Sequence, residues 1–490
     1  MAQEDASPIE TRLGRDMEPG EFRAALHRAA DMVADYLGGV ERYSVVPNIA
    51  PGDVRAMLPT SAPREPEPIE RVFEDYAALI EPNVTHWNHP GFMGYFAISG
   101  SGPGIIGETL AAGLNVNTML WRSGPASTEL EEVVCDWLRQ WMGLPAEFRG
   151  HINDTASMST VLGLAVARHR LQEYDIRQRG MAGRSDLPAV VVYCSPLAHS
   201  SVDKACLLLG IGLSNLYKVE VDEQFRMKPA ALRVAIERDI AAGKRPMAIV
   251  SSVGTTSATS IDPTPEIAAI AREFGVWLHV DAAYAGSAAI CPELRERMPG
   301  LELADSLVTN PHKWLAVPVD CSILYVRDLP LLKGAFSHVA EYLRTGDGDV
   351  TNLMDLGVQL GRRFRSLKMW FVMRTFGLSG LQAMIREHCR IAVLLDGWVR
   401  GDARFEVAAP TTLSLVCFRA VRGATIAEQN AFNERLMGEV NAAGPVLLSH
   451  TKLGERYVLR CAIGNIRTEQ RHVELVWLLV REAYERLSLR

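Results

Sequence analysis

The chain has 490 residues, and it lacks a long hydrophobic run, an excess of basic charge and any paired cysteine motif. No apolar stretch approaches the roughly 20 residues that a membrane-spanning helix needs, so we expect no membrane partner. The N-terminal MAQEDASPIETR has no basic segment followed by an apolar one, which argues against a signal peptide and predicts a cytoplasmic protein. The formal net charge of -7 argues against a nucleic-acid partner, because backbone phosphates require clustered Lys and Arg.

The eight cysteines are scattered, and no two form a CxxC pair. The sequence therefore predicts neither a metal ribbon nor a thioredoxin-type redox site. His86 and His89 are close enough in sequence to suggest a metal. Because no cysteine or carboxylate neighbours accompany them, we interpret them as packing or hydrogen-bonding residues and expect no metal site.

Hydrophobic residues make up 48% of the chain and charged residues 22%, which is typical of a globular protein with a large core. The first part of the chain predicts helices at 20–40 and 69–80, separated by a proline-rich stretch. It has few core-forming strands. We therefore expect residues 1–100 to form a helical arm and dimerisation segment that packs on a partner subunit.

From about residue 130, short β-rich runs alternate with amphipathic helical stretches such as 228–242 and 263–274. The predicted strands are 189–194, 247–253, 276–281, 303–309 and 321–326. Strand and helix in series indicate an α/β fold with a mainly parallel sheet. Ligands in such sheets bind beyond the carboxyl ends of the strands. We expect this large ligand-binding domain to span residues 101–370.

The sequence pattern changes again after about residue 370. The patterns predict helices at 378–400, 426–441 and 468–488, a strand at 413–418, and a hairpin-like pair formed by VLLSH and RYVLRCAI. These elements indicate a smaller α+β domain at residues 371–490.

Lys313 follows the strand predicted at 303–309, in the segment TNPHKWLAVPVD. A lysine between apolar segments is poorly solvated, which lowers its pKa and makes the neutral amine available to attack an aldehyde. Asp281 ends the strand predicted at 276–281, one strand–helix unit earlier. Pyridoxal phosphate (PLP) needs such a carboxylate against its pyridine nitrogen. A surface lysine and a helix-capping aspartate are the alternative interpretations.

Three further polar segments also follow apolar runs. At residues 154–157 the chain turns from polar to helical, and free amides with the hydroxyls of Thr155 and Ser157 could cradle a phosphate. His199 could lie over a flat ring, and the threonine pair at 255–256 could bind a ring substituent. A helix cap, a satisfied histidine and a turn are the respective alternatives. Together with the lysine and the aspartate, these residues place a phosphate cradle, a stacking histidine, a threonine, a carboxylate and an amine each at the end of a strand, an agreement that chance would rarely produce.

Longer motifs make the chain similar to a known family. They are THWNHPGF (85–92), GPASTELE (124–131), HVDAAYAGSAAICPE (279–293), NPHKWL (310–315) and LGRRFRSLKMWFV (360–372). On these motifs the chain resembles the group II PLP-dependent amino acid decarboxylases, and within them the aromatic-L-amino-acid decarboxylases, over residues 20–485. The resemblance implies PLP fold type I, with a mainly parallel seven-stranded sheet, and a homodimer with shared active sites.

The resemblance also implies the role of each site residue. Lys313 is expected to hold PLP as a Schiff base, Asp281 to pair with its pyridine nitrogen, and His199 to stack on its ring. The remaining cofactor contacts are expected from Thr155, Ala156, Ser157, Thr256, Ala283, Asn310 and His312. The substrate pocket is expected to be lined by Trp87, Tyr95, Phe96, Ile98 and His199.

The expected reaction is decarboxylation of an aromatic L-amino acid to its amine and CO2. Two departures from the family leave alternatives. The segment 344–359 contains no Tyr, Phe or His where the family carries a loop Tyr that protonates Cα, and Ile98 replaces a Thr. The alternatives are an oxygen-dependent decarboxylation and deamination to an aldehyde, decarboxylation of a non-aromatic amino acid, and a non-catalytic dimeric scaffold.

Overall fold

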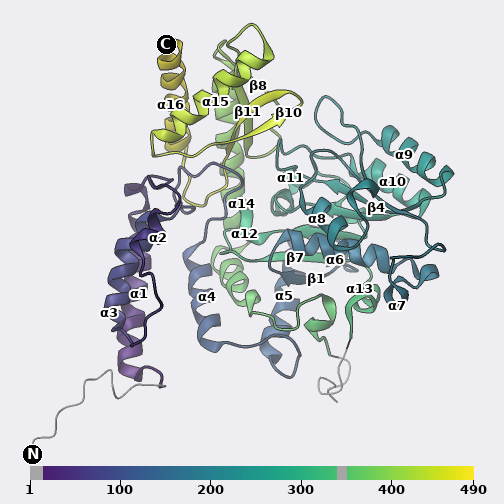
Figure 1. The fold of residues 1–490 in the computed structure, drawn as a ribbon, viewed down its shortest axis with the longest axis horizontal. Helices are drawn as coiled ribbons and strands as arrows, with labels where there is room; N and C mark the ends of the chain where they lie inside the picture. Colours follow the sequence, from purple (N-terminus) through teal and green to yellow (C-terminus); the bar gives the residue numbers. More distant parts are fainter. Residues whose placement is uncertain (1–14, 339–349, 490) are drawn as a thin grey trace, which may run out of the picture.

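The structure is a computed structural model that describes residues 15–338 and 350–489 (Figure 1). Figure 1 shows an N-terminal group of helices standing beside the body, a large sheet between helices, and a smaller sheet at the C-terminal end. The expected α/β class with a smaller α+β part is confirmed. The division of the chain at residues 100 and 370 stays a prediction.

The large sheet has seven strands within the described part of the chain, in the order β1-β7-β6-β5-β4-β2-β3. Their bounds are Arg149–Asn153 (β1), Val190–Cys194 (β2), Leu216–Lys218 (β3), Arg245–Ser252 (β4), Trp277–Asp281 (β5), Ser306–Thr309 (β6) and Ser322–Val326 (β7). The pairs from β3 to β6 are parallel, and β7 is antiparallel to both β6 and β1. The connection from β6 to β7 holds only the short helix α12 (Pro311–Trp314), whereas a parallel return needs a longer crossover.

Helices cover both faces of this sheet. They are α5 (Pro125–Trp141), α6 (Ala156–His169), α7 (Ile176–Arg179), α8 (Ser201–Leu208), α9 (Pro229–Ala241), α10 (Thr264–Phe274), α11 (Pro292–Arg295) and α13 (Leu329–Phe336). Successive strand residues enter different apolar clusters: Ile249 packs in one and Val250 in the other. Because both faces are buried, these strands read as continuous apolar runs in the sequence.

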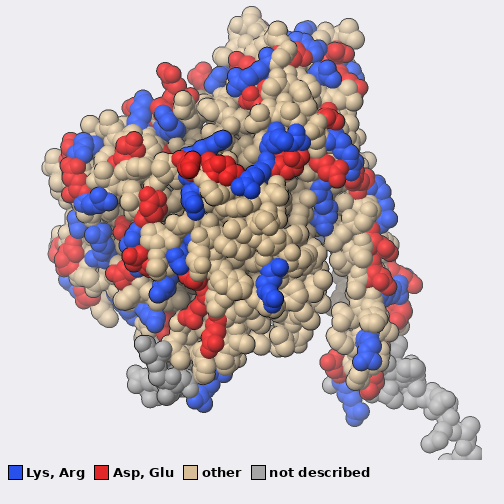
Figure 2. Space-filling view, turned by 180° about the vertical axis from the view of Figure 1, so that it is seen from behind, with Lys and Arg blue, Asp and Glu red and all other residues tan. Residues whose placement is uncertain are grey.

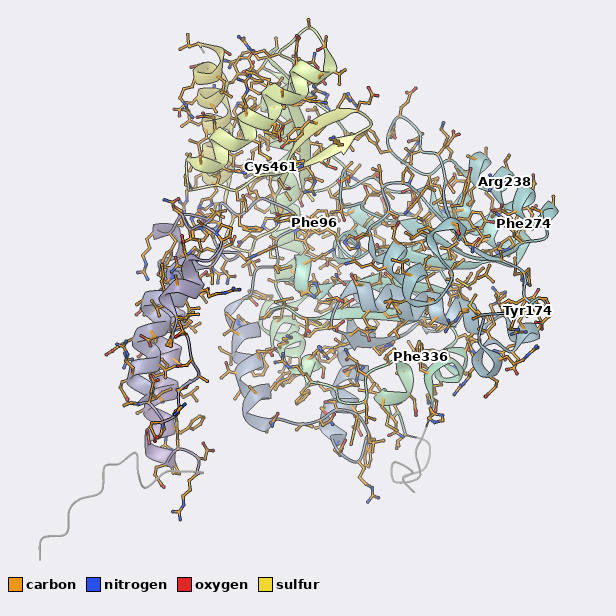
Figure 3. The ribbon with its side chains drawn as sticks, in the orientation of Figure 1. Phe96, Tyr174, Arg238, Phe274, Phe336 and Cys461 are labelled. Carbon is orange, nitrogen blue, oxygen red and sulfur yellow. The ribbon has the colours of Figure 1, made fainter. Side chains whose placement is uncertain are left out.

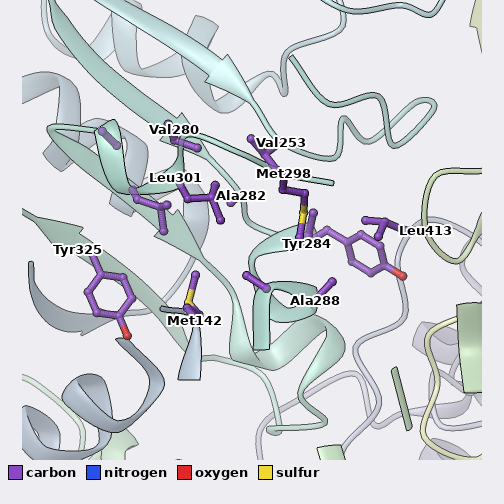
Figure 4. Packing of buried hydrophobic residues seen from close by; sticks show 14 of the residues in the cluster. Met142, Val253, Val280, Ala282, Tyr284, Ala288, Met298, Leu301, Tyr325 and Leu413 are labelled. Carbon is purple, nitrogen blue, oxygen red and sulfur yellow. The ribbon is translucent and has the colours of Figure 1, made fainter. Parts of the chain in front are cut away.

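The core reaches from the sheet to the C-terminal part. Figure 4 shows Val253 and Met298 near Tyr284, with Leu413 beside the Tyr284 ring. All four side chains are buried, so burial of apolar surface holds the two parts together beside the end of β5.

The smaller sheet is antiparallel, in the order β10-β11-β9-β8. Its strands are Phe405–Val407 (β8), Leu415–Ala420 (β9), Ser449–Leu453 (β10) and Arg456–Ala462 (β11), and its helices are α14 (Arg365–Arg400), α15 (Ile426–Ala442) and α16 (Gln470–Ser488). The backbone of α14 is interrupted at Gly377, whose φ of 61° favours glycine. The predicted helix at 378–400 is the part after this interruption.

The N-terminal arm consists of α1 (Pro19–Gly38), α2 (Asp53–Met57) and α3 (Ile69–Asp75), followed by a π-helical turn at Tyr76–Ile80. Neither α1 nor α3 buries a residue in the single chain. The arm leads to α4 (Gly102–Leu114), which packs on α14. No helix of the described residues is long and apolar enough to cross a membrane.

Candidate active site

Lys313 lies in α12, directly after the carboxyl end of β6. The helix begins at the N-cap Asn310, whose carbonyl accepts a hydrogen bond from the Lys313 amide (2.9 Å). Within the described chain, Lys313 Nζ has no hydrogen bond or ion pair; it lies 5.5 Å from the centroid of the Phe96 ring. Burial lowers the pKa of Lys313, and Asp281 opposes this effect. The amine is therefore prepared for reaction with an electrophile.

Asp281 is the last residue of β5, as predicted. Its Oδ1 accepts a hydrogen bond from the Ala283 amide (3.1 Å), which fixes the carboxylate at the turn after the strand. On the neighbouring strand, Ser252 is in register with Asp281. The parallel pairing of β4, β5 and β6 brings the residues after all three strands to one edge of the sheet, where Lys313 also lies.

His199 stands between β2 and α8 at the same edge. Its Nδ1 accepts a hydrogen bond from the Ser201 amide (3.2 Å), so the neutral ring carries its proton on Nε2. The pKa of His199 is lowered, mainly because the walls of the site desolvate the ring, while Asp281 opposes the shift. A neutral imidazole at pH 7 thus presents an N–H donor toward the cavity.

The N-terminus of α6 contributes the predicted phosphate cradle. Thr155 is the N-cap, and its Oγ1 accepts a hydrogen bond from the Met158 amide (3.4 Å). The first turn leaves the amides of Ala156 and Ser157 without an intrahelical partner, at the positive end of the helix dipole. These donors suit the phosphate of a bound cofactor.

One cavity collects most of the predicted cofactor residues. It is lined by Phe96, Ala156, His199, Ser252, Gly254, Thr255, Thr256, Asp281, Ala283, Tyr284 and Lys313. Of the other predicted cofactor contacts, Thr155, Ser157 and His312 are sequence neighbours of lining residues and Asn310 is three positions before Lys313, but none of the four lines the cavity. His312 Nδ1 accepts a hydrogen bond from the Cys321 amide (2.9 Å), and burial lowers the pKa of His312 to about 3.

The predicted substrate residues divide into two groups. Phe96 lines the cavity and stacks on Tyr284, with ring centroids 3.8 Å apart. Trp87 and Tyr95 stack on each other 5.9 Å apart outside that cavity, and Tyr95 is 58% exposed with a φ of 51°. Ile98 is half-buried and is not a lining residue either. Of these four residues, only Phe96 lines the cavity of Lys313 in the single chain.

The sequence-based prediction missed the lining residues Ser252, Gly254 and Tyr284, and it also missed Arg460. The ring of Tyr284 packs against Phe96 and also stacks on Trp314, with ring centroids 4.5 Å apart. Arg460 of β11 is 3% exposed and donates hydrogen bonds to the carbonyls of Thr256 (2.5 Å) and Tyr95 (3.2 Å). Tyr284 stands in the DAAYAG motif, which could have revealed it, whereas nothing near Arg460 in the sequence indicates its position.

The segment 344–359 lies partly outside the described residues, as far as residue 349. Leu353, within its described part, is 2% exposed and packs in the apolar cluster that contains Leu162. The absence of a Tyr from this segment stays as the sequence gives it, and the effect of that absence on the reaction stays a prediction.

The site fits pyridoxal phosphate. The carbonyl-reactive amine and a carboxylate share a cavity with a histidine ring and a helix N-terminus. In addition, Ser252 Oγ and Asn310 Oδ1 are buried without a hydrogen-bond partner among the described residues, which a polar ligand would supply. Fold and site together define a PLP-dependent enzyme.

Comparisons with known proteins give the family. The model "Pyridoxal-dependent decarboxylase conserved domain" matches residues 51–421. The chain is 41% identical over 478 residues to aromatic-L-amino-acid decarboxylase of Bos taurus, covering 95% of this chain and 96% of the relative. It is 38% identical over 491 residues to phenylacetaldehyde synthase of a Rosa hybrid cultivar, covering 96% and 95%.

Among solved structures, Oryza sativa TDC with PLP and tryptamine superposes with a TM-score of 0.92 at 36% identity, covering 96% of this chain and 99% of that chain. This protein belongs to the pyridoxal-dependent decarboxylase family, and it is a PLP-dependent carboxy-lyase. The expectations of family, cofactor and enzyme class are confirmed, and the non-catalytic scaffold is set aside.

Proposed function

We propose that the enzyme decarboxylates an aromatic L-amino acid to the corresponding amine and CO2. The observation that carries the proposal is the convergence of Lys313, Asp281 and His199 on one cavity whose wall is the ring of Phe96. When bound, PLP supplies the electron sink for the electrons of the broken Cα–carboxylate bond. The side chains of the protein then have to bind the cofactor, orient the substrate and supply the proton that Cα receives.

Each of the three side chains has one task. Lys313 would hold the cofactor through its amine, and burial, which lowers the pKa of Lys313, favours the neutral form that this bond needs. Asp281 would hold a proton on the pyridine nitrogen through its carboxylate. His199 donates from Nε2, because Nδ1 already accepts the Ser201 amide, and this donor is suited to orienting the substrate carboxylate. Ala283 and the amides of Ala156 and Ser157 complete the cofactor site.

An aromatic substrate is supported by the aromatic character of the walls. Phe96 offers a ring face beside Lys313, and the Trp87–Tyr95 pair stands next to it in the chain. Rings prefer such stacked or edge contacts with other rings. The names of relatives point the same way: one acts on aromatic L-amino acids, and one solved structure holds tryptamine.

The test is a substrate screen with the purified holoenzyme. CO2 release and product mass are followed with L-tryptophan, L-tyrosine, L-phenylalanine and, as non-aromatic controls, L-glutamate and L-leucine. We expect an aromatic substrate to have the highest kcat/KM. A higher kcat/KM with L-glutamate or L-leucine would overturn the substrate class while leaving the decarboxylase assignment in place.

A second product is favoured by one comparison, since a relative at 38% identity is a phenylacetaldehyde synthase. That route consumes O2 and water and releases CO2, aldehyde, ammonia and hydrogen peroxide, whereas the amine route releases CO2 and consumes one proton at Cα. We propose the amine route. Wild-type enzyme should release CO2 and amine in equal amounts without peroxide. Stoichiometric peroxide from wild type would reverse the assignment.

We further propose that the active form is a homodimer. On α4, the side chains Ile106, Leu110 and Leu114 are 55%, 49% and 62% exposed, at a spacing that places them on one helix face. On α1, Phe22 is 54% exposed. Figure 2 shows a broad area beside the arm that is largely free of charged residues, on the face opposite to that of Figure 1. An apolar surface of this kind marks a protein interface.

The oligomeric state can be tested by light scattering after size-exclusion chromatography. Leu110→Glu should shift the wild-type dimer toward monomer and lower activity, because the partner is expected to complete the substrate pocket. The control is Val234→Glu, at a side chain that is 63% exposed on α9. A wild-type monomer with full activity would contradict the dimer.

For the location, we propose the cytoplasm. All eight cysteines are free, and seven of them are buried. Unpaired thiols are typical of a reducing compartment. Fractionation of the native host, followed by an immunoblot, tests this point.

A further inference from the structure

A second cavity, of about 630 Å³, lies at the far end of helix α6 from the cofactor cradle. It is bounded by the C-terminal turn of α6, by α7, by the end of α8 and by the end of α13. In Figure 3, Phe336 at the end of α13 and Tyr174 ahead of α7 flank this region. The volume falls in the range of small-molecule sites, and no part of the mechanism above uses the cavity.

Apolar side chains form part of the walls of this cavity. They include Ile176, Leu187, Leu209 and Phe336, which belong to the apolar cluster on this face of the sheet or pack against it. At the rim, Leu208 is 73% exposed. Such walls favour a ligand with a hydrophobic body.

Three cationic or titratable side chains face the same cavity: Arg168, His169 and Arg177. Arg168 Nη1 donates to the Leu209 carbonyl (2.9 Å), and Arg177 donates to the carbonyls of Gly334 and Ser337. His169 Nε2 lies 3.2 Å from the amide nitrogen of Gln172. Within residues 15–338 and 350–489, none of these contacts is to a carboxylate. Since a guanidinium has five N–H donors, both arginines keep donors for a ligand.

No Asp or Glu of the described residues lines this cavity. Asp186 forms ion pairs with Arg179 (2.9 Å) and Arg184 (2.7 Å), and Glu173 pairs with Arg245 (3.4 Å). The cavity therefore keeps an excess of positive charge beside apolar walls. The surrounding charges show the same excess, because Arg177 and Arg168 both lower the pKa of His169 in addition to the effect of burial.

We infer that this cavity is a second binding site, separate from the active site, for an organic carboxylate with an apolar body. The carboxylate is held between Arg168 and Arg177, and the body lies against Leu187, Leu209 and Phe336. Charge-assisted hydrogen bonds from a guanidinium, often in pairs, suit a carboxylate. The ligand sits at the C-terminal end of the helix whose first turn cradles the cofactor phosphate.

The test uses holoenzyme and 3-phenylpropionate as the probe, measured by isothermal titration calorimetry. Because this probe could also enter the active site, titrations are done with the active site occupied by a saturating substrate-analogue amine, tryptamine. We expect saturable binding that weakens at least tenfold in Arg168→Gln and in Arg177→Gln. The matched control is Arg170→Gln on the same turn, whose side chain is exposed and reaches the Gly275 carbonyl instead; this variant should bind like wild type.

Two comparisons separate the carboxylate from other ligands. The neutral 3-phenylpropanol should bind at least tenfold more weakly, and inorganic phosphate should not compete. Competition by phosphate would mean that the site takes a phosphate ligand and not a carboxylate. Equal binding of the alcohol would overturn the role of the arginines. Absence of binding to wild type overturns the site itself, without touching the decarboxylase assignment.

A measurement on unmodified protein covers the case in which a variant fails to fold. Phenylglyoxal labels accessible arginines, and peptide mass spectrometry reads the extent at each one. The probe should reduce labelling of Arg168 and Arg177 at least threefold and leave Arg170 unchanged. Equal labelling with and without the probe would overturn the proposal.

Discussion

Trp314 Nε1 donates a hydrogen bond to His388 Nδ1 over 2.9 Å, deep inside the protein. Trp314 follows Lys313 in the chain, and His388 lies on the long helix α14. The ring of Trp314 also stacks on Tyr284, which stacks on Phe96 in the active site. A single histidine of α14 therefore fixes the residue next to the reactive lysine.

The first prediction removes this acceptor. His388→Leu should leave the buried indole N–H unsatisfied and cost about 1–3 kcal/mol of unfolding free energy. His388→Gln, which keeps an acceptor oxygen, is the matched control and should retain most of the stability. Urea unfolding followed by tryptophan fluorescence measures both. Equal losses in the two variants would show that ring packing, rather than the hydrogen bond, is what matters.

The second prediction concerns the stability of the folded protein at acidic pH. Burial lowers the pKa of His279 to about 4, although Asp281 opposes it, while an unfolded histidine titrates near 6.5. Between these two pKa values, His279 binds a proton in the unfolded chain but not in the folded chain. The stability contributed by the neutral ring is fully present above pH 6.5 and is lost as the pH falls toward 4, on the order of 3 kcal/mol.

Thermal unfolding of wild type from pH 7.5 to 4.5 should show this loss. The variant His279→Asn should show a shallower pH slope, relative to its own value at pH 7.5. His450 offers a control, because its side chain is exposed: His450→Asn should keep the wild-type slope. A wild-type midpoint that stays constant down to pH 5 would contradict the prediction.

The third prediction is made for the buried ion pair between Glu131 and Arg362. Their side chains are 1% and 2% exposed, with Nη2 and Oε1 2.5 Å apart, and both also bind the backbone of Ile152. Removing one partner of such a pair leaves a buried charge and should cost about 3–5 kcal/mol in Glu131→Ala. The double variant Glu131→Gln/Arg362→Met should cost less than the sum of its single variants.

The exposed pair Arg233–Glu273 serves as the comparison for this experiment. Its double-mutant cycle should give a coupling below about 1 kcal/mol. Coupling of similar size in both pairs would mean that burial does not govern the strength of the Glu131–Arg362 contact.

The fourth prediction tests Asp281 with the cofactor kept saturating. Asp281→Asn should lower the single-turnover rate of CO2 release roughly 10²–10⁴-fold, the range for a group that controls a reacting proton. Asp281→Glu should recover part of the rate. The control is Asp305→Asn, since Asp305 accepts the Leu278 amide (2.7 Å) at the opposite end of the strands. A comparable rate loss in the control would mean that folding, and not chemistry, explains the effect.

Much of the large domain could be predicted from sequence because its strands are buried on both faces. The predicted runs at 276–281 and 321–326 match β5 and β7 to within a residue. The sequence did not reveal β1, whose first residues Arg149 and Gly150 are not fully buried, or the three-residue strands β3 and β8. Short, polar edge segments carry little apolar periodicity.

The same contrast holds for the site. Lys313, Asp281 and His199 were predictable because each follows a strand, and the sheet gathers the ends of its strands. Arg460 could not be found this way, since in RYVLRCAI it looks like an ordinary strand residue. Its approach to Thr256 results from packing of residues about two hundred positions apart.

That contact with Arg460 has a bearing on biosynthesis. The carbonyls of Thr256 and Tyr95 receive their hydrogen bonds from a strand that leaves the ribosome almost last. A nascent chain that stops before residue 460 lacks the donor of both hydrogen bonds, so the rim of the cofactor site is completed only after residue 460 has been synthesised.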